Sequence, residues 1–186
     1  MLKWRETMNF IYETDRLILQ VLNESYSMQV LTFLSRNRDY FDRYELAKTD
    51  NFYTEEFQKK LLHKEFNQII KGSYLRLYFF LKKSPQRIIG TLSFSRLHPA
   101  FQSCQIGYKL DPLYQHRGLA TEALQFVIPI VSQEYSLHRI EAYVLPSNQP
   151  SICLLERLGF EVEGIARDYA IIAGRWQNHL QYSLIL

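Results

Sequence analysis

A short polar segment, Gln115 to Thr121, constrains the fold of this chain more than any other feature, because it joins two kinds of periodicity. Before it, Ser103 to Leu110 has the alternating pattern of a strand, which Asp111-Pro112 ends because proline has no backbone N–H to donate. After it, apolar residues repeat about every 3.6 residues and predict a helix from about Gly118 to Tyr135. A strand that turns directly into an amphipathic helix is typical of an α/β domain.

The same two periodicities continue along the rest of the chain. Alternating or β-rich runs predict strands at Arg16–Leu22, Tyr74–Leu81, Arg87–Leu97, Arg139–Leu145 and Phe160–Arg167. Two apolar runs, Tyr169–Ala173 and His179–Leu186, close the chain. Two helices are expected between Ser25 and Phe66, a short one at Pro150–Leu158, and turns at Lys82–Gln86 and Gly174–Asn178. The order β-αα-βββ-α-β-α-ββ predicts one α/β domain over residues 1–186, with a mixed sheet flanked by helices.

Composition excludes several classes of protein. The chain has 186 residues, 47% apolar and 22% charged, so it can bury a core of its own and is expected to be soluble. No apolar run approaches the ~20 residues of a membrane span, and Met1–Phe10 lacks the apolar region of a secretory signal. The net charge is +3, and the sequence has no run of basic residues that would indicate binding of nucleic acid. Cys104 and Cys153 stand alone, and no histidine belongs to a metal-binding motif, so we expect a cytoplasmic protein without a metal.

The segment Gln115 to Thr121 has the properties of an anion-binding turn. The first amides of a helix have no partner within it and carry about half a positive charge, which suits a phosphate or diphosphate. Gly118 allows the backbone to approach an anion closely, Ala120 leaves room, and His116 and Arg117 can add positive charge. Neither a Walker loop nor a GxGxxG motif is present. Glycine is also common at such turns for geometric reasons, so the residues alone leave both interpretations open.

Short motifs are spread over nearly the whole chain. They are Thr14-Asp15-Arg16-Leu17-Ile18-Leu19, Asn37-Arg38-Asp39, Ile106-Gly107-Tyr108, Gly118-Leu119-Ala120-Thr121-Glu122-Ala123, Asn148-x-x-Ser151, Leu158-Gly159-Phe160 with Glu163-Gly164, and Gly174-x-Trp176. Each motif alone is weak, but the ordered set resembles the GNAT superfamily of acetyl-CoA-dependent N-acetyltransferases. Within it, the chain is most similar to the RimJ/RimL-like N-terminal acetyltransferases of ribosomal proteins. The resemblance implies a mixed, mostly antiparallel sheet and direct transfer of an acetyl group to an amine.

The resemblance also implies which residues bind acetyl-CoA. The strand Ser103–Leu110 would diverge from the strand Arg139–Leu145, and the pantetheine arm would lie in the gap. Asn148 would contact the coenzyme and Ser151 would protonate the leaving thiolate, although both residue types also cap helices and a helix begins here. The implied coenzyme-binding residues are Lys109, Leu110, Gln115, His116, Arg117, Gly118, Leu119, Ala120, Thr121, Asn148 and Ser151.

The resemblance does not assign the general base. Positions at which members of the family carry an acidic residue or a tyrosine are occupied here by Gln105, Leu155 and Ala170. The remaining candidates are Glu141, Tyr143 and Asp168. A glutamate on a strand is more often the partner of an arginine, such as Arg139 or Arg167. His179, near the Trp176 turn, could line a substrate cleft, but we favour a surface position for it, and we expect Cys153 in the core.

The missing carboxylate favours one kind of acceptor amine. An α-amino group has a pKa of ~7.7–8.0, so a useful fraction is neutral near pH 7, whereas a lysine amine at ~10.4 is almost wholly protonated. We therefore expect transfer from acetyl-CoA to the N-terminal α-amine of a ribosomal or other protein. Two alternatives stay open: transfer to a small-molecule amine such as a polyamine or an antibiotic, and a catalytically inactive acyl-CoA-binding regulatory module. The resemblance also implies that the two early helices line the acceptor groove. A homodimer is plausible, and no membrane or nucleic acid is expected to take part.

Overall fold

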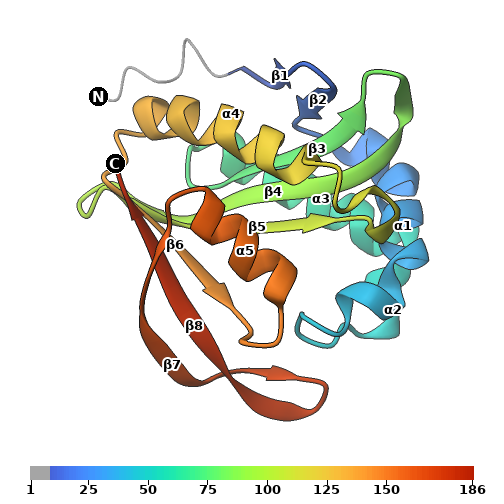
Figure 1. Ribbon diagram of the computed structural model, residues 1–186. Helices are drawn as coiled ribbons and strands as arrows, with labels where there is room; N and C mark the ends of the chain where they lie inside the picture. Colours follow the sequence, from blue (N-terminus) through green and yellow to red (C-terminus); the bar gives the residue numbers. More distant parts are fainter. Residues whose placement is uncertain (1–8) are drawn as a thin grey trace.

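One eight-stranded sheet forms the centre of the molecule (Figure 1). The computed structural model describes residues 9–186. Most of Met1–Phe10 lies outside these residues, so the structure does not test the prediction that this segment is no signal sequence. The strands are β1 (Ile11–Glu13), β2 (Leu17–Gln20), β3 (Leu75–Leu81), β4 (Ser84–His98), β5 (Ser103–Leu110), β6 (Arg139–Val144), β7 (Glu161–Ile172) and β8 (Arg175–Ile185). They are ordered β1-β2-β3-β4-β5-β6-β8-β7, and among these described strands only β5 and β6 pair in parallel. The predicted α/β class with a mixed, mostly antiparallel sheet is confirmed.

The helices cover both faces of the sheet. They are α1 (Ser27–Arg36), α2 (Arg38–Phe41), α3 (Glu55–Ile70), α4 (Leu119–Glu134) and α5 (Gln149–Arg157). Figure 1 shows α4 and α5 in front of the sheet and α1 and α3 on the other side. A large core includes Val127 of α4 and Leu155 of α5, and a smaller one includes Phe33 of α1 and Leu62 of α3. Among the helices of residues 9–186, none has the length and apolar character needed to cross a bilayer.

The structure differs from the sequence-based expectation mainly at turns. A two-residue turn replaces the predicted Lys82–Gln86, and Pro85 lies in β4 at a register shift, where its missing N–H interrupts no ladder pair. The predicted turn Gly174–Asn178 is also too long, because Ala173 and Gly174, with φ of 49° and 75°, already reverse the chain. The strand β1 and the one-turn helix α2 were not predicted, since neither is long enough to show a periodicity.

Candidate active site

The two parallel strands at the centre of the sheet separate before they end. β5 and β6 pair only over three positions, from Ser103–Arg139 to Gln105–Glu141, although β5 continues to Leu110 and β6 to Val144. Residues of both strands beyond these pairs line a cavity of about 730 Å³. The gap predicted between these two strands is therefore present.

Side chains from both faces of the sheet reach this cavity. Ala142 and Val144 belong to the core beneath α4 and α5, whereas Tyr143, between them on the same strand, points to the opposite face. Lys109 of β5 likewise lies on the side of α2. The cavity therefore connects the two faces of the sheet at the gap, so that two molecules can approach each other from opposite sides.

The segment that precedes α4 presents unpaired amides to the cavity. Gly118 is the residue before the helix and has φ of 74°, in the left-handed region that glycine adopts without strain. The first bond within the helix runs from the Glu122 amide to the Gly118 carbonyl at 2.9 Å. No side chain caps this end of α4, so the amides of Leu119, Ala120 and Thr121 find no acceptor within the described residues. A helix end of this kind is a site for an anion.

An arginine far away in the sequence holds this segment in place. The Nε atom of Arg16 is 2.5 Å from Oε2 of Glu122, and its Nη1 atom donates to the carbonyl of Arg117 at 2.9 Å. The hydroxyl of Thr14 donates to Oε1 of the same glutamate at 2.5 Å. Partial burial opposes ionisation of Glu122, but the bonds from Thr14 and Arg16 outweigh it and lower the pKa of this carboxyl. Nothing in the sequence indicated a role for Arg16 by itself, although the motif that contains it contributed to the resemblance.

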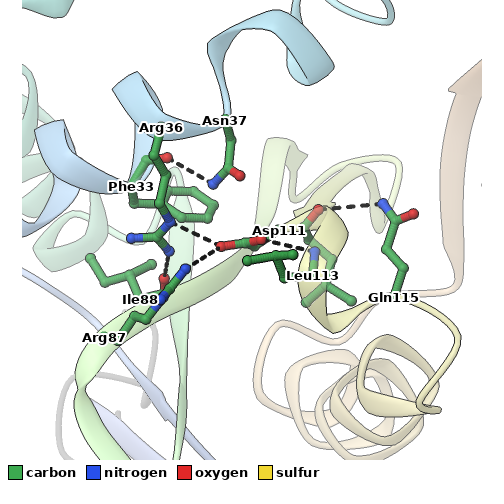
Figure 2. A network of polar contacts seen from close by, with 9 residues as sticks. Phe33, Arg36, Asn37, Arg87, Ile88, Asp111, Leu113 and Gln115 are labelled. Carbon is green, nitrogen blue, oxygen red and sulfur yellow. Dashed lines mark hydrogen bonds and ion pairs between the residues drawn. The ribbon is translucent and has the colours of Figure 1, made fainter.

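Asp111, directly after β5, is the centre of a buried polar network that Figure 2 shows. Its side chain is 1% exposed and accepts hydrogen bonds from Arg36 Nε of α1 at 2.9 Å and Arg87 Nη2 of β4 at 3.3 Å. The Oδ1 atom accepts the backbone N–H of Leu113 at 3.0 Å. Arg36 also donates to the carbonyl of Ile88. The network joins α1 and β4 to the turn at Leu113, which leads into the segment Gln115–Thr121.

Residues from α2 and the loop after it line the cavity on the other face. The Nε2 atom of Gln115 donates to the Tyr40 hydroxyl at 2.9 Å, which joins α2 to the anion-binding segment. Lys109 Nζ is 2.5 Å from Glu45 Oε1, and among the described residues that line the cavity Glu45 is the one with a carboxylate. Burial lowers the pKa of Lys109, and the charge of Glu45 opposes that shift. The expectation that the early helices border the acceptor side is consistent with this placement.

The start of α5 brings two hydroxyl groups together inside the cavity. Asn148 caps this helix, because its side-chain oxygen accepts the Ser151 amide at 3.3 Å, so the capping role that the sequence allowed is present. Both residues also line the cavity. The hydroxyl of Tyr108 lies 2.7 Å from Ser151 Oγ, and burial raises the pKa of this tyrosine to about 12. Tyr108 is therefore protonated at neutral pH and shares its proton with Ser151. The sequence did not indicate this pair of hydroxyl groups.

A bulge in β7 places an aromatic side chain against Tyr143 and His179, two residues that line the cavity. The register between β7 and β8 shifts between Ala166 and Ala170, and Asp168 in this stretch has φ of 45°. Its amide donates to the side chain of Asn178 at 2.9 Å, which fixes the bulge. Tyr169 then stacks on Tyr143 of β6, with ring centroids 4.5 Å apart. The hydroxyl of Tyr169 accepts a hydrogen bond from Gln105 of β5 at 3.4 Å, so the aromatic pair contacts β5 where its pairing with β6 ends.

Most of the predicted coenzyme-binding residues lie together. Those that line the cavity are Lys109, Leu110, Gln115, His116, Gly118, Leu119, Ala120, Thr121, Asn148 and Ser151. Arg117 does not line it, and its guanidinium lies 5.5 Å from the centroid of the Tyr114 ring. The binding roles of these residues stay predictions. No cluster of three or more potential metal ligands occurs among residues 9–186.

The candidates for a general base lie in different places. Tyr143 lines the cavity, and burial raises its pKa, so this phenol is protonated at neutral pH. Glu141 is 2.9 Å from Arg139, the kind of arginine partner that the sequence suggested. Asp168 is exposed and does not line the cavity. Two expectations were wrong: Cys153 is exposed and lines the cavity, and His179 is 6% exposed and lines it too. The strand register that buries His179 cannot be read from its sequence neighbours.

Comparisons with known proteins agree with this geometry. Residues 16–161 match the profile of the acetyltransferase (GNAT) domain. The probable N-acetyltransferase YjcK of Bacillus subtilis is 38% identical over 146 residues, which cover 78% of this chain and 80% of that protein. The [ribosomal protein uS5]-alanine N-acetyltransferase of Escherichia coli is 31% identical over 174 residues, 92% of this chain and 88% of that protein.

Solved structures have the same fold. The ribosomal-protein-S5-alanine acetyltransferase from Vibrio fischeri superposes with a TM-score of 0.90 at 28% identity, covering 95% of this chain and 97% of that one. A RimL ribosomal L7/L12 α-N-protein acetyltransferase in complex with coenzyme A has a TM-score of 0.85 at 20% identity, covering 95% and 98%. The fold, the gap between the parallel strands and the family match agree, and the chain belongs to the GNAT family of N-acetyltransferases.

Proposed function

We propose that this protein transfers the acetyl group of acetyl-CoA to the N-terminal α-amine of a ribosomal protein. The observation that carries the proposal is the cavity at the gap, which has uncapped helix amides on one face of the sheet and an opening lined by α2 residues on the other. The amides of Leu119, Ala120 and Thr121 suit the diphosphate of the coenzyme, and the gap between β5 and β6 suits its extended arm. All the predicted coenzyme residues except Arg117 line this cavity.

The lining of the cavity supports an α-amine as the acceptor. A polyamine or an aminoglycoside is polycationic and would favour an acidic cleft, but Glu45, the one carboxylate among the described lining residues, is already paired with Lys109. No unpaired carboxylate is available there to take a proton from a lysine amine. An α-amino group needs less assistance, since its pKa of ~7.7–8.0 leaves part of it neutral near pH 7. The uS5-alanine acetyltransferase relatives add support for a ribosomal acceptor, and such an acceptor is consistent with a cytoplasmic location.

The hydroxyl pair at the start of α5 supports a catalytic rather than a purely regulatory protein. Ser151 Oγ and the Tyr108 hydroxyl are 2.7 Å apart, and both belong to residues that line the cavity. Burial keeps Tyr108 protonated, so the pair holds a proton that can pass to a leaving thiolate. We assign that role to the pair, with Ser151 nearer to the sulfur. Positioning of the thioester and the amine across the gap adds to the rate enhancement.

A turnover assay with a panel of amines tests the proposal. Peptides with the N-terminal sequences of ribosomal proteins, including one that begins with alanine, are compared with N-blocked lysine peptides and polyamines. We expect release of coenzyme A and a mass increase of one acetyl group on an α-amine peptide. Faster turnover of a polyamine would favour the small-molecule alternative, and binding of acetyl-CoA without turnover of any amine would favour the regulatory module.

A further inference from the structure

His179 is a buried histidine whose ring reaches the cavity from β8. It is 6% exposed and lines the same cavity as Ser151. Its Nδ1 atom lies 3.2 Å from the carbonyl oxygen of Gln177, which can only accept a hydrogen bond, so Nδ1 carries the proton of the neutral ring. The lone pair is then on Nε2, for which the part of the chain that the structure describes provides no hydrogen-bond partner. This nitrogen is ready to accept a proton.

The strand register places His179 on the acceptor side of the gap. Gln181 of β8 is paired with Tyr143 of β6, and side chains on a strand alternate between the two faces. His179, two residues before Gln181, therefore points to the same face as Tyr143 and away from α5. Ser151 reaches the cavity from α5, so the histidine and the hydroxyl pair approach the gap from opposite faces.

Few charged groups surround the ring of His179. Tyr169 of the β7 bulge is 4.9 Å away between ring centroids, and Tyr143 of β6 stacks on the other side of Tyr169. The next acidic group along β6, Glu141, is neutralised by Arg139 at 2.9 Å. Within residues 9–186 no ion pair reaches the ring of His179. Burial lowers the pKa of this histidine below its usual value, and a backbone carbonyl only partly opposes the shift.

We propose that His179 is the general base of this acetyltransferase, with Nε2 accepting the proton of the attacking amine. The inference rests on the proposed function. The amine nitrogen forms a bond to the acetyl carbon while the carbon–sulfur bond breaks. The amine proton passes to Nε2, and the sulfur receives a proton from the Tyr108–Ser151 pair. His179 then releases its proton to water and the hydroxyl pair regains one, so the reaction consumes no net proton.

A neutral histidine suits an α-amine better than it suits a lysine. At pH 7 to 8 most of the ring is neutral, because burial holds its pKa below the ordinary ~6.5. A weak base of this kind cannot deprotonate a free lysine ammonium with a pKa of ~10.4, but it can take the proton that becomes acidic once the amine has attacked. The base therefore selects amines that arrive neutral, in agreement with the proposed acceptor.

Kinetics of a matched pair of variants tests this role. His179→Gln keeps the size and polarity of the side chain without a titratable nitrogen, and His63→Gln changes an exposed histidine on α3 as the control. We expect kcat/KM for the amine to fall by about 10²- to 10³-fold in His179→Gln, with an unchanged Kd for acetyl-CoA, and no change in His63→Gln. In His179→Ala, added imidazole should restore part of the activity, and the rescue should rise with the neutral fraction of imidazole. A small loss of activity, or rescue that does not follow neutral imidazole, would overturn the proposal.

Two measurements separate this inference from the proposed function. The variants are assayed with whichever amine the wild-type protein turns over, so a polyamine acceptor would refute the ribosomal assignment and still test His179. The tautomer of His179 is measured by ¹⁵N NMR on the wild-type protein with acetyl-CoA, which requires neither a folded variant nor a known acceptor. A proton on Nδ1 and none on Nε2 at pH 7.5 supports the role. A proton on Nε2 excludes it, whatever the acceptor.

Discussion

A single charge placed at the start of α4 should weaken acetyl-CoA binding without weakening the fold. Ala120 is the second residue of this helix and lines the cavity. Gly118→Glu would be a poorer choice, because a side chain at φ of 74° adds backbone strain of about 1–2 kcal/mol to any effect of charge. Ala120→Glu avoids that strain, and Ala120→Gln has the same size without the charge. The difference between the two variants therefore isolates electrostatics.

The glutamate in Ala120→Glu should weaken acetyl-CoA binding but stabilise the fold without ligand. Two unit charges ~6 Å apart at an effective dielectric constant of about 40, appropriate for a partly open cavity, repel by ~1.4 kcal/mol. A diphosphate carries about two charges, so the repulsion is about 3 kcal/mol, or a roughly 100-fold higher Kd in Ala120→Glu than in Ala120→Gln. Without ligand, the glutamate faces the positive end of the helix dipole and should stabilise the fold by about 0.3–1 kcal/mol.

Calorimetric titration of acetyl-CoA and thermal unfolding without ligand measure both quantities. We expect Ala120→Glu to unfold at the wild-type temperature or slightly above it and to bind weakly. Higher salt should reduce the difference in Kd between the two variants, since screening weakens the repulsion between the glutamate and the diphosphate. Equal affinities of the two variants, both near the wild-type value, would show that the diphosphate does not lie at this helix end.

Three further predictions concern the groups around the cavity. Tyr108→Phe removes the partner of Ser151 and should lower kcat by about 10²-fold with little effect on the Kd for acetyl-CoA; an unchanged kcat would exclude the hydroxyl pair as the proton donor. Asp111→Asn removes a buried charge that pairs with Arg36 and Arg87, and should lower the free energy of unfolding by about 2–4 kcal/mol in urea titrations. The loss should be smaller than for a fully buried ion pair, because both arginines keep some access to water. His179, with a lowered pKa in the folded state, binds its proton more readily when unfolded. Stability should therefore decrease as the pH falls below ~6.5, and His179→Gln should flatten that dependence; an identical pH dependence in the variant would contradict the burial argument.

Local patterns were sufficient for the part of the site that lies on consecutive residues. The spacing of residues along the chain predicts the strand before Asp111, the segment Gln115–Thr121 and the helix after it. The observed β5 and α4 match their predicted bounds within one residue. The uncapped amides follow from the same spacing, because any helix leaves its first amides unpaired. This is why most of the coenzyme residues inferred from sequence line one cavity.

Contacts between distant segments could not be predicted in this way. Arg16 and Glu122 are 106 positions apart, and no periodicity joins them. The sequence favoured a surface position for His179 over one in a substrate cleft, but the register between β6 and β8 turns it into the cavity. The bulge that brings Tyr169 over Tyr143 depends on a register shift in the last hairpin, which the sequence showed only as the interval between the predicted strand Phe160–Arg167 and the apolar run Tyr169–Ala173. The sequence therefore indicated the coenzyme side more completely than the acceptor side.

The topology of the sheet accounts for an anion site in a chain with little excess charge. β5 and β6 are the one parallel pair among the described strands, so their carboxyl ends meet at the same edge, and each strand is followed by a helix. The first residues of those helices, Leu119 of α4 and Gln149 of α5, both line the cavity. Each helix N-terminus carries about half a positive charge, and the two converge on the gap. Lys109 adds little, because Glu45 neutralises it. Backbone dipoles, more than the net charge of +3, therefore favour a diphosphate here and would also favour the oxyanion that forms when an amine attacks the thioester.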